Sequence, residues 1–141
     1  MKSEKTLELS IDGRVIFTSC GKWLHPLFEL ERFLSDRRLD LESAEIRDKI
    51  IGRGSAFLII RMGFRRIHAG VLSRLGKEVL DRAGATCTWE SLVEVIQCRT
   101  EGLLRDTFDS EEAYQVLSAL AGEDGGSARE GKATSSSAPG G

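Results

Sequence analysis

Long apolar runs are absent from this chain of 141 residues. The longest uninterrupted one is Ala56–Ile60, far short of the roughly 20 residues that span a bilayer, so we expect no membrane helix. Residues 1–6 contain an acidic side chain and precede no apolar stretch, unlike a secretory signal. The sequence therefore predicts a cytoplasmic protein.

Cysteine and histidine are scarce, and their positions exclude several kinds of site. The three cysteines, Cys20, Cys87 and Cys98, are an odd number with no Cys-x-x-Cys spacing, so neither a paired disulfide framework nor a metal clip is expected. Neither His25 nor His68 has a second ligand at a metal-binding spacing. We expect free thiols, no metal site and no cofactor.

Aromatic residues make up only 6% of the chain, while hydrophobic residues make up 40%. The interior must therefore be built from Leu, Ile, Val and Ala, as in a mixed helix and sheet domain. From Gly122 onward the composition changes: the last 20 residues hold six Gly and four Ser and no Leu, Ile, Val or aromatic residue. This pattern predicts one domain over residues 5–121 and a disordered tail over 122–141.

Local patterns predict a mixture of strands and helices. Residues 6–11 and 14–19 flank Asp12-Gly13, a dipeptide typical of a type I′ turn, and form a predicted β-hairpin. Residues 26–34 have the apolar spacing of an amphipathic helix with proline in its first turn. Residues 40–47 are polar enough to be a loop, with a short extended piece at 44–47. Residues 50–62 fit either a buried strand or a buried helix.

The second half of the chain continues the alternation. Ser73 is a predicted cap for a helix that Gly84 ends. The predicted elements are a strand over 65–71, a helix over 73–83, a strand over 85–89, a short helix over 90–97 and an exposed terminal helix over 110–120. Strands that alternate with helices indicate an α/β sheet with parallel pairings.

Basic residues are concentrated in the middle of the chain. Residues 47–82 hold nine Lys or Arg against three Asp or Glu, although the whole chain has a net charge of -2. Two interpretations remain open: a solvated face paired with acidic neighbours, or a site for an anion. We expect neither nucleic acid nor a membrane as a partner.

The clearest local feature is the segment 48–56, Asp-Lys-Ile-Ile-Gly-Arg-Gly-Ser-Ala. If a helix begins here, its free N–H groups and dipole favour an anion, and Gly52 with Gly54 would let a phosphate approach the backbone. Lys49, Arg53 and Ser55 could add donors. The alternative is that the glycines serve helix packing. The segment matches neither a P-loop nor Gly-x-Gly-x-x-Gly.

Several residues together carry a resemblance to a known family. They are Gly21, Pro26-Leu27, Asp48-Lys49-x-x-Gly52, Ala56, the helix start at Ser73, and Ile96 with Arg99 and Gly102. Over about Leu7–Gly102 the chain resembles an uncharacterised prokaryotic domain family with a cytidine deaminase-like fold. The resemblance implies a three-layer α/β/α sandwich, with a mixed central sheet that opens with the hairpin and a helix over 48–62.

The zinc ligands of true deaminases are missing from the corresponding positions. Deaminases of this fold carry His-x-Glu or Cys-x-Glu at one helix start and Pro-Cys-x-x-Cys at the next. In this chain the corresponding helix starts are residues 48–55 and the segment Val71-Leu72-Ser73-Arg74-Leu75. Deamination by the zinc mechanism is therefore not expected.

Two functional hypotheses of different class follow. The first is binding of a nucleotide or another phosphate-containing small molecule at helix N-termini, where the resemblance places the zinc cleft. Its candidate residues are Asp48, Lys49, Gly52, Arg53, Ser55, Ser73 and Arg99. The second is a non-catalytic oligomeric scaffold or interaction module, which an exposed apolar patch on 26–34 or 113–120 would indicate. Either way we expect a homo-oligomer.

Overall fold

The structure, a computed structural model, describes residues 5–21, 24–96 and 103–130. Five strands form one mixed sheet in the order β2-β1-β3-β4-β5. The elements are β1 (Leu7–Ile11), β2 (Arg14–Ser19), α1 (His25–Ser35), the 3-10 turn η1 (Leu41–Ser43), β3 (Ala44–Ile51), α2 (Arg53–Met62), β4 (Arg66–Ser73), α3 (Arg74–Arg82), β5 (Thr86–Val93) and α5 (Ser110–Glu130). No helix in these ranges is long and apolar enough to cross a membrane.

The amino-terminal hairpin and the first helix confirm the prediction. Strands β1 and β2 are antiparallel, and the turn residues Asp12 and Gly13 have φ values of 53° and 81°. Two positive φ angles in succession are what a type I′ turn requires. Helix α1 carries Pro26 in its first turn and buries Leu27 and Leu30. These elements could be predicted because their signals are local.

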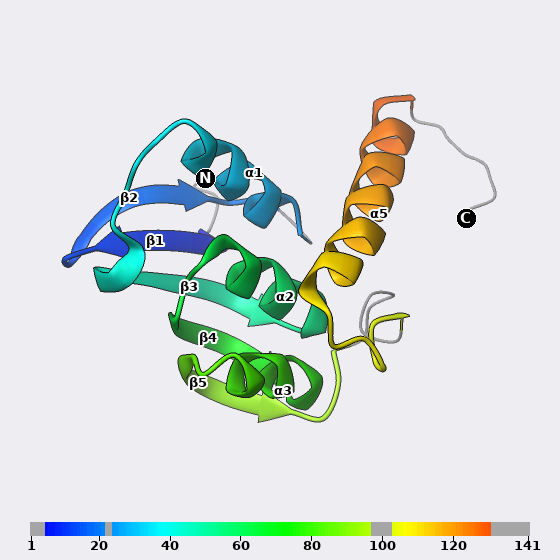
Figure 1. Ribbon diagram of the computed structural model, residues 1–141. Helices are drawn as coiled ribbons and strands as arrows, with labels where there is room; N and C mark the ends of the chain where they lie inside the picture. Colours follow the sequence, from blue (N-terminus) through cyan, green and yellow to red (C-terminus); the bar gives the residue numbers. More distant parts are fainter. Residues whose placement is uncertain (1–4, 22–23, 97–102, 131–141) are drawn as a thin grey trace.

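The helices lie on one face of the sheet, as Figure 1 shows. Helix α2 packs against α1, α3 and α5, and the core between helices and sheet is made mainly of Leu, Ile, Ala and Phe. The prediction of an α/β fold with a mixed sheet that opens with a hairpin is confirmed. The described residues form two layers, and they supply no helix layer on the opposite face, unlike the three-layer sandwich that we expected.

The predicted helix over 48–62 begins later than expected. Asp48 and Lys49 belong to β3, and α2 starts at Arg53 with Gly52 as its N-cap. The predicted loop over 40–47 is likewise η1 followed by the first half of β3. Strand β3 forms because β1 and β4 supply hydrogen-bonding partners on both sides, which a single sequence does not display.

Two later elements also differ from the prediction. Strand β5 runs to Val93 in parallel with β4, so the predicted helix over 90–97 is a strand in its first half, and Gln97 lies outside the described residues. The terminal helix α5 is not simply exposed, because Ala113 and Leu117 are fully buried where α5 packs on α2. It continues to Glu130, past the domain limit predicted at Ala121. Disorder of the tail stays a prediction.

Candidate functional site

The sheet face that the helices leave uncovered carries a row of polar side chains. The strand register places Glu8 beside Arg47, Arg47 beside His68, and His68 beside Thr88. Side chains alternate between the two faces of a strand, so Lys49 shares this face with Arg47. Charged groups from three neighbouring strands are thus presented together, away from the helices.

A hollow of about 300 Å³ lies over this part of the sheet. It is lined by Lys5, Thr6, Leu7, Glu8, Arg47, Asp48, Lys49, His68, Gly70 and Glu90. The lining holds four residues that can carry positive charge and three acids, and it lies beside the middle of β3 and β4. A charged small molecule could contact both signs of charge here.

The alternation of buried and exposed side chains along β3 and β4 is interrupted at this hollow. Ile46 and Ile51 are both fully buried, as are Ile67 and Leu72 on the next strand, at 3% and 0% exposure. Residues five apart would point to opposite faces in a regular strand, so the alternation breaks between them. Lys49 is exposed as the regular alternation requires, and the break falls after it, because 49% of the next residue, Ile50, is also open to solvent.

The acidic and basic groups around the hollow interact with one another. Nδ1 of His68 lies 2.8 Å from the hydroxyl of Thr88, and Nε2 lies 3.5 Å from a carboxylate oxygen of Glu90. Lys5 pairs with Glu8 at 3.6 Å. Burial raises the pKa of the Asp48 carboxyl from 3.8 to about 7, against the opposing hydrogen bonds from backbone N–H groups of residues 50 and 49. A carboxyl that changes charge near neutral pH is typical of functional sites.

The N-termini of α2 and α3, where the sequence predicted an anion site, are packed against each other. A Cβ on Gly76 of α3 would lie 2.8 Å from the carbonyl oxygen of Gly52. The hydroxyl of Ser73 accepts a 2.9 Å hydrogen bond from the N–H of Gly76, so it caps α3 as expected. Ser55 lies buried in the first turn of α2. Gly76 therefore permits the close approach of the two helix ends, while the roles of Gly52 and Gly54, in packing or in anion binding, stay predictions.

Arg53 fills the space beside these two helix ends. Its side chain is fully buried, and its guanidinium donates to the carbonyls of Leu75, Leu104 and Thr107 at 2.6 to 2.8 Å. It also bonds Glu78 of α3 at 2.8 Å. A guanidinium has five N–H donors, and four of them are used in these contacts. Arg53 therefore links α2, α3 and the segment before α5.

The structure separates the candidate residues into two groups. Asp48 and Lys49 line the hollow on the sheet, whereas Gly52, Arg53, Ser55 and Ser73 lie at the buried helix ends. Arg99 lies outside the described residues. Their proposed role in ligand binding stays a prediction, but the two groups do not line one common pocket.

Sequence reasoning missed Arg47, His68 and Glu90 as members of the site. The signal for Arg47 was the alternation in Ala44-Glu45-Ile46-Arg47, with apolar residues at every second position, which is typical of a half-buried strand. His68 and Glu90 join it only through the register of three strands, and no pattern within the chain records that register.

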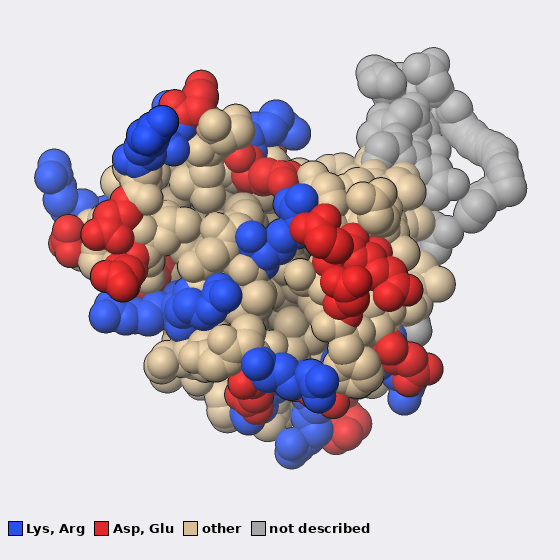
Figure 2. Space-filling view, in the orientation of Figure 1, with Lys and Arg blue, Asp and Glu red and all other residues tan. Residues whose placement is uncertain are grey.

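The basic block of residues 47–82 does not form a single surface. Arg47, Lys49 and Arg66 lie on the open sheet face, whereas Arg61, Arg74 and Lys77 lie on helices. Figure 2 shows the helix-bearing face, where Lys and Arg are interspersed with Asp and Glu. Arg61, for example, pairs with Glu31 at 3.0 Å and with Glu111 at 2.8 Å. Within the described ranges, no three His, Cys, Asp or Glu side chains are grouped to hold a metal ion.

Comparisons with known proteins agree with the fold. No curated protein matches the chain. The crystal structure of a DUF1893 family protein (TM1506) from Thermotoga maritima superposes with a TM-score of 0.73 at 24% identity, covering 82% of this chain and 80% of that one. The family described as TM1506, domain of unknown function (DUF1893), matches residues 1–120. The chain therefore belongs to the DUF1893 family, whose function is not established.

Proposed function

We propose that this protein binds a small phosphate-containing molecule, a mononucleotide in size, in the hollow on the open face of its sheet. The observation that carries this proposal is the convergence of Arg47, Lys49 and His68 from two neighbouring strands on that hollow. Lysine and arginine bind phosphate oxygens through charge-assisted hydrogen bonds. The ligand class is the one that the sequence suggested, but the binding site proposed here lies on the sheet rather than at the helix ends.

The size of the hollow limits the ligand. Pockets for drug-sized molecules have volumes of roughly 300–1,000 Å³, and this one, at about 300 Å³, lies at the lower limit. A dinucleotide would extend beyond it. The acids that also line the hollow, Glu8 and Glu90, are placed to accept hydrogen bonds from sugar hydroxyls while the basic groups bind the phosphate.

The test is a calorimetric titration with nucleoside monophosphates and the matching nucleosides. Monophosphates should bind, nucleosides should bind poorly, and affinity should fall as salt rises, because the contacts are charged and exposed. Lys49→Ala removes a contact worth about 1.5–3 kcal/mol, so affinity should drop roughly ten- to a hundredfold. Lys77→Ala, on helix α3 away from the sheet hollow, is the matched control and should bind like the wild type.

The outcome that overturns the proposal is equally definite. If no monophosphate binds the wild type below about 1 mM, or if Lys49→Ala binds as well as the wild type, the site is not a phosphate site. Native mass spectrometry of freshly isolated protein adds an independent measurement, because it detects a co-purified nucleotide and the mass of any oligomer in the same spectrum.

The scaffold hypothesis has less support from the described residues. The apolar faces of 26–34 and 113–120 are used inside the fold, where Leu30, Ala113 and Leu117 are fully buried. The exposed large apolar side chains lie elsewhere, at Val15, Leu39, Ile50, Trp89, Val95, Leu103 and Phe108. Homo-oligomer formation and kinship with cytidine deaminase-like domains remain parts of the proposal that the mass measurement and further structures can test.

A further inference from the structure

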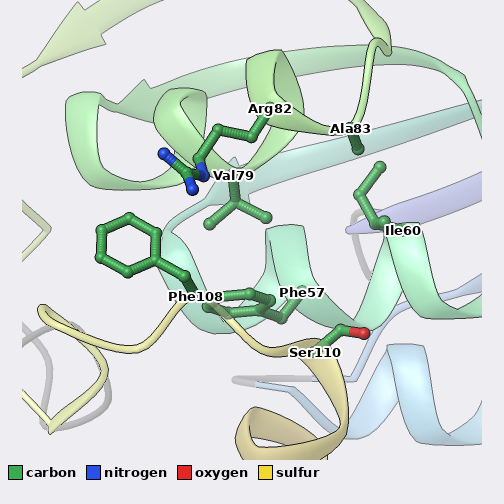
Figure 3. A pocket seen from close by; sticks show the side chains of 7 residues that line it. All are labelled: Phe57, Ile60, Val79, Arg82, Ala83, Phe108 and Ser110. Atoms are coloured by element: carbon green, nitrogen blue, oxygen red, sulfur yellow. The ribbon is translucent and has the colours of Figure 1, made fainter.

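A second hollow lies in the helix layer, on the other side of the sheet from the proposed phosphate site. It has a volume of about 240 Å³ and lies between α2, α3 and the start of α5 (Figure 3). Its lining consists of Phe57, Ile60, Val79, Arg82, Ala83, Phe108 and Ser110. Most of this lining is apolar, and only Arg82 and Ser110 bring polar side chains.

Phe108 is unusual among the aromatic residues of the fold because half of its side chain is exposed, at 50%. Two guanidinium groups lie over its ring: that of Arg53 at 4.8 Å and that of Arg82 at 4.5 Å from the ring centroid. Such cation–π contacts are attractive but weak at exposed sites. Phe108 forms an aromatic wall of the hollow (Figure 3).

Three other arginines of the helix layer have carboxylate partners that Arg82 lacks among the described residues. Arg53 pairs with Glu78, Arg61 with Glu31 and Glu111, and Arg74 with Glu94. Within the described part of the chain, the guanidinium of Arg82 has a ring contact but no carboxylate within ion-pair distance. Arg82 is exposed and lines this hollow, whose lining contains no acid, so its guanidinium is open to an anion bound there.

We propose that this hollow binds a small planar aromatic carboxylate, with its ring between the apolar walls and its carboxylate on Arg82. The planar fork of a guanidinium matches the two oxygens of a carboxylate. The hydroxyl of Ser110 adds a second donor at the rim. Phe57 and Phe108 line the hollow, and contact with aromatic rings gives an aromatic ligand more than its buried area alone provides.

The volume of the hollow selects a ligand with one or two fused rings. At about 240 Å³ it lies below the roughly 300–1,000 Å³ of sites for drug-sized molecules. Its lining is mainly apolar with one basic side chain, Arg82, whereas the sheet hollow is lined by several charged residues, so the two sites favour different ligands. The two proposals therefore stand or fall separately.

The experiment follows the amide signals of ¹⁵N-labelled full-length protein during titration with benzoate and with indole-3-carboxylate. Two probes separate charge from ring: acetate has the carboxylate without the ring, and benzyl alcohol has the ring without the charge. We expect saturable shifts at residues 57, 79 and 108 with a Kd below about 1 mM for an aromatic carboxylate. Acetate and benzyl alcohol should each bind at least about tenfold more weakly, since each lacks one half of the contacts.

Two variants complete the test. Arg82→Gln keeps a hydrogen-bonding side chain but removes the charge, and it should weaken binding about tenfold or more. Arg74→Gln, an exposed arginine on the same helix, is the control and should leave binding unchanged, with thermal unfolding showing that both variants fold. The proposal is overturned if no aromatic carboxylate gives saturable shifts at the hollow, if benzyl alcohol binds equally well, or if Arg82→Gln binds like the wild type.

Discussion

Nε of Arg53 donates a 2.6 Å hydrogen bond to the carbonyl oxygen of Leu104, a residue 51 positions further along the chain. Nη2 of the same side chain bonds the carbonyl of Thr107 at 2.7 Å. Carbonyl groups in an irregular buried segment need donors from elsewhere. Leu104 is itself fully buried. The Leu104 side chain and the Arg53 guanidinium therefore together attach the segment before α5 to the rest of the fold.

Replacement of this arginine should be strongly destabilising. Arg53→Leu leaves three backbone carbonyls without their donor, and each buried unsatisfied group costs about 1–3 kcal/mol. We expect the free energy of unfolding, measured with urea, to fall by about 3–5 kcal/mol, the range for removing one partner of a buried charged network. Arg74→Leu breaks only an exposed pair with Glu94 and should cost less than about 1 kcal/mol. Equal losses for the two variants would contradict this role of Arg53.

The close approach of α2 and α3 gives a second prediction. Gly76→Ala places a Cβ 2.8 Å from the carbonyl oxygen of Gly52, and backbone atoms on both sides leave little freedom to adjust. Overpacking of this kind costs about 1–3 kcal/mol, more than alanine gains over glycine inside a helix. The melting temperature should fall by several degrees. Lys77→Ala, at the next position, should change it by less than half as much, and a Gly76→Ala protein as stable as the wild type would show that the helices are free to separate.

The parts of the fold that the sequence predicts are those with short-range causes. The turn at Asp12-Gly13 and the cap at Ser73 each depend on residues within three positions. The extent of β3 and β5 depends instead on partners in other strands. Leu92, for example, lies opposite Leu72 in the register, and that pairing extends the strand past Trp89 into the region where local preference predicted a helix.

In the candidate site, too, contacts between residues far apart in the chain could not be predicted from the sequence. Arg53 was predicted to contact an anion, since it follows a glycine at a helix start. Its acceptors lie 22, 25, 51 and 54 positions away, and nothing near residue 53 indicates them. Asp48 and Lys49 line a pocket but lie on a strand rather than at a helix start, because β1 and β4 pair with β3 on both sides. Their role in ligand binding stays a prediction.

Zinc content gives a third prediction. Among the described residues, no three His, Cys, Asp or Glu side chains lie together in a way that could hold a metal ion. The sequence also lacks the Cys-x-x-Cys pair that deaminases use. We expect purified protein to contain well below one zinc per chain by elemental analysis, and to leave cytidine and deoxycytidine unchanged in prolonged assays. About one zinc per chain, retained after dialysis against a chelator, would contradict the expectation.

The pH dependence of stability gives the fourth prediction, and it concerns Asp48. Burial raises the pKa of this carboxyl from 3.8 to about 7 in the fold, so the folded protein holds the proton more tightly than the unfolded chain does. The contribution of this group to stability is therefore complete below about pH 4, is lost progressively as pH rises toward 7, and is level above that. Asp48→Asn cannot ionise, so it should not show this loss.

The measurement is urea unfolding of wild type and Asp48→Asn at pH values from 4.5 to 7.5. One pKa unit corresponds to about 1.4 kcal/mol, so the free energy of unfolding of the variant minus that of the wild type should rise by at least that amount across the range. Asp36→Asn, at a carboxylate whose side chain is 81% exposed, is the matched control and should run parallel to the wild type. If the difference between Asp48→Asn and wild type stays constant or falls as pH rises, the fold does not raise the pKa of the Asp48 carboxyl.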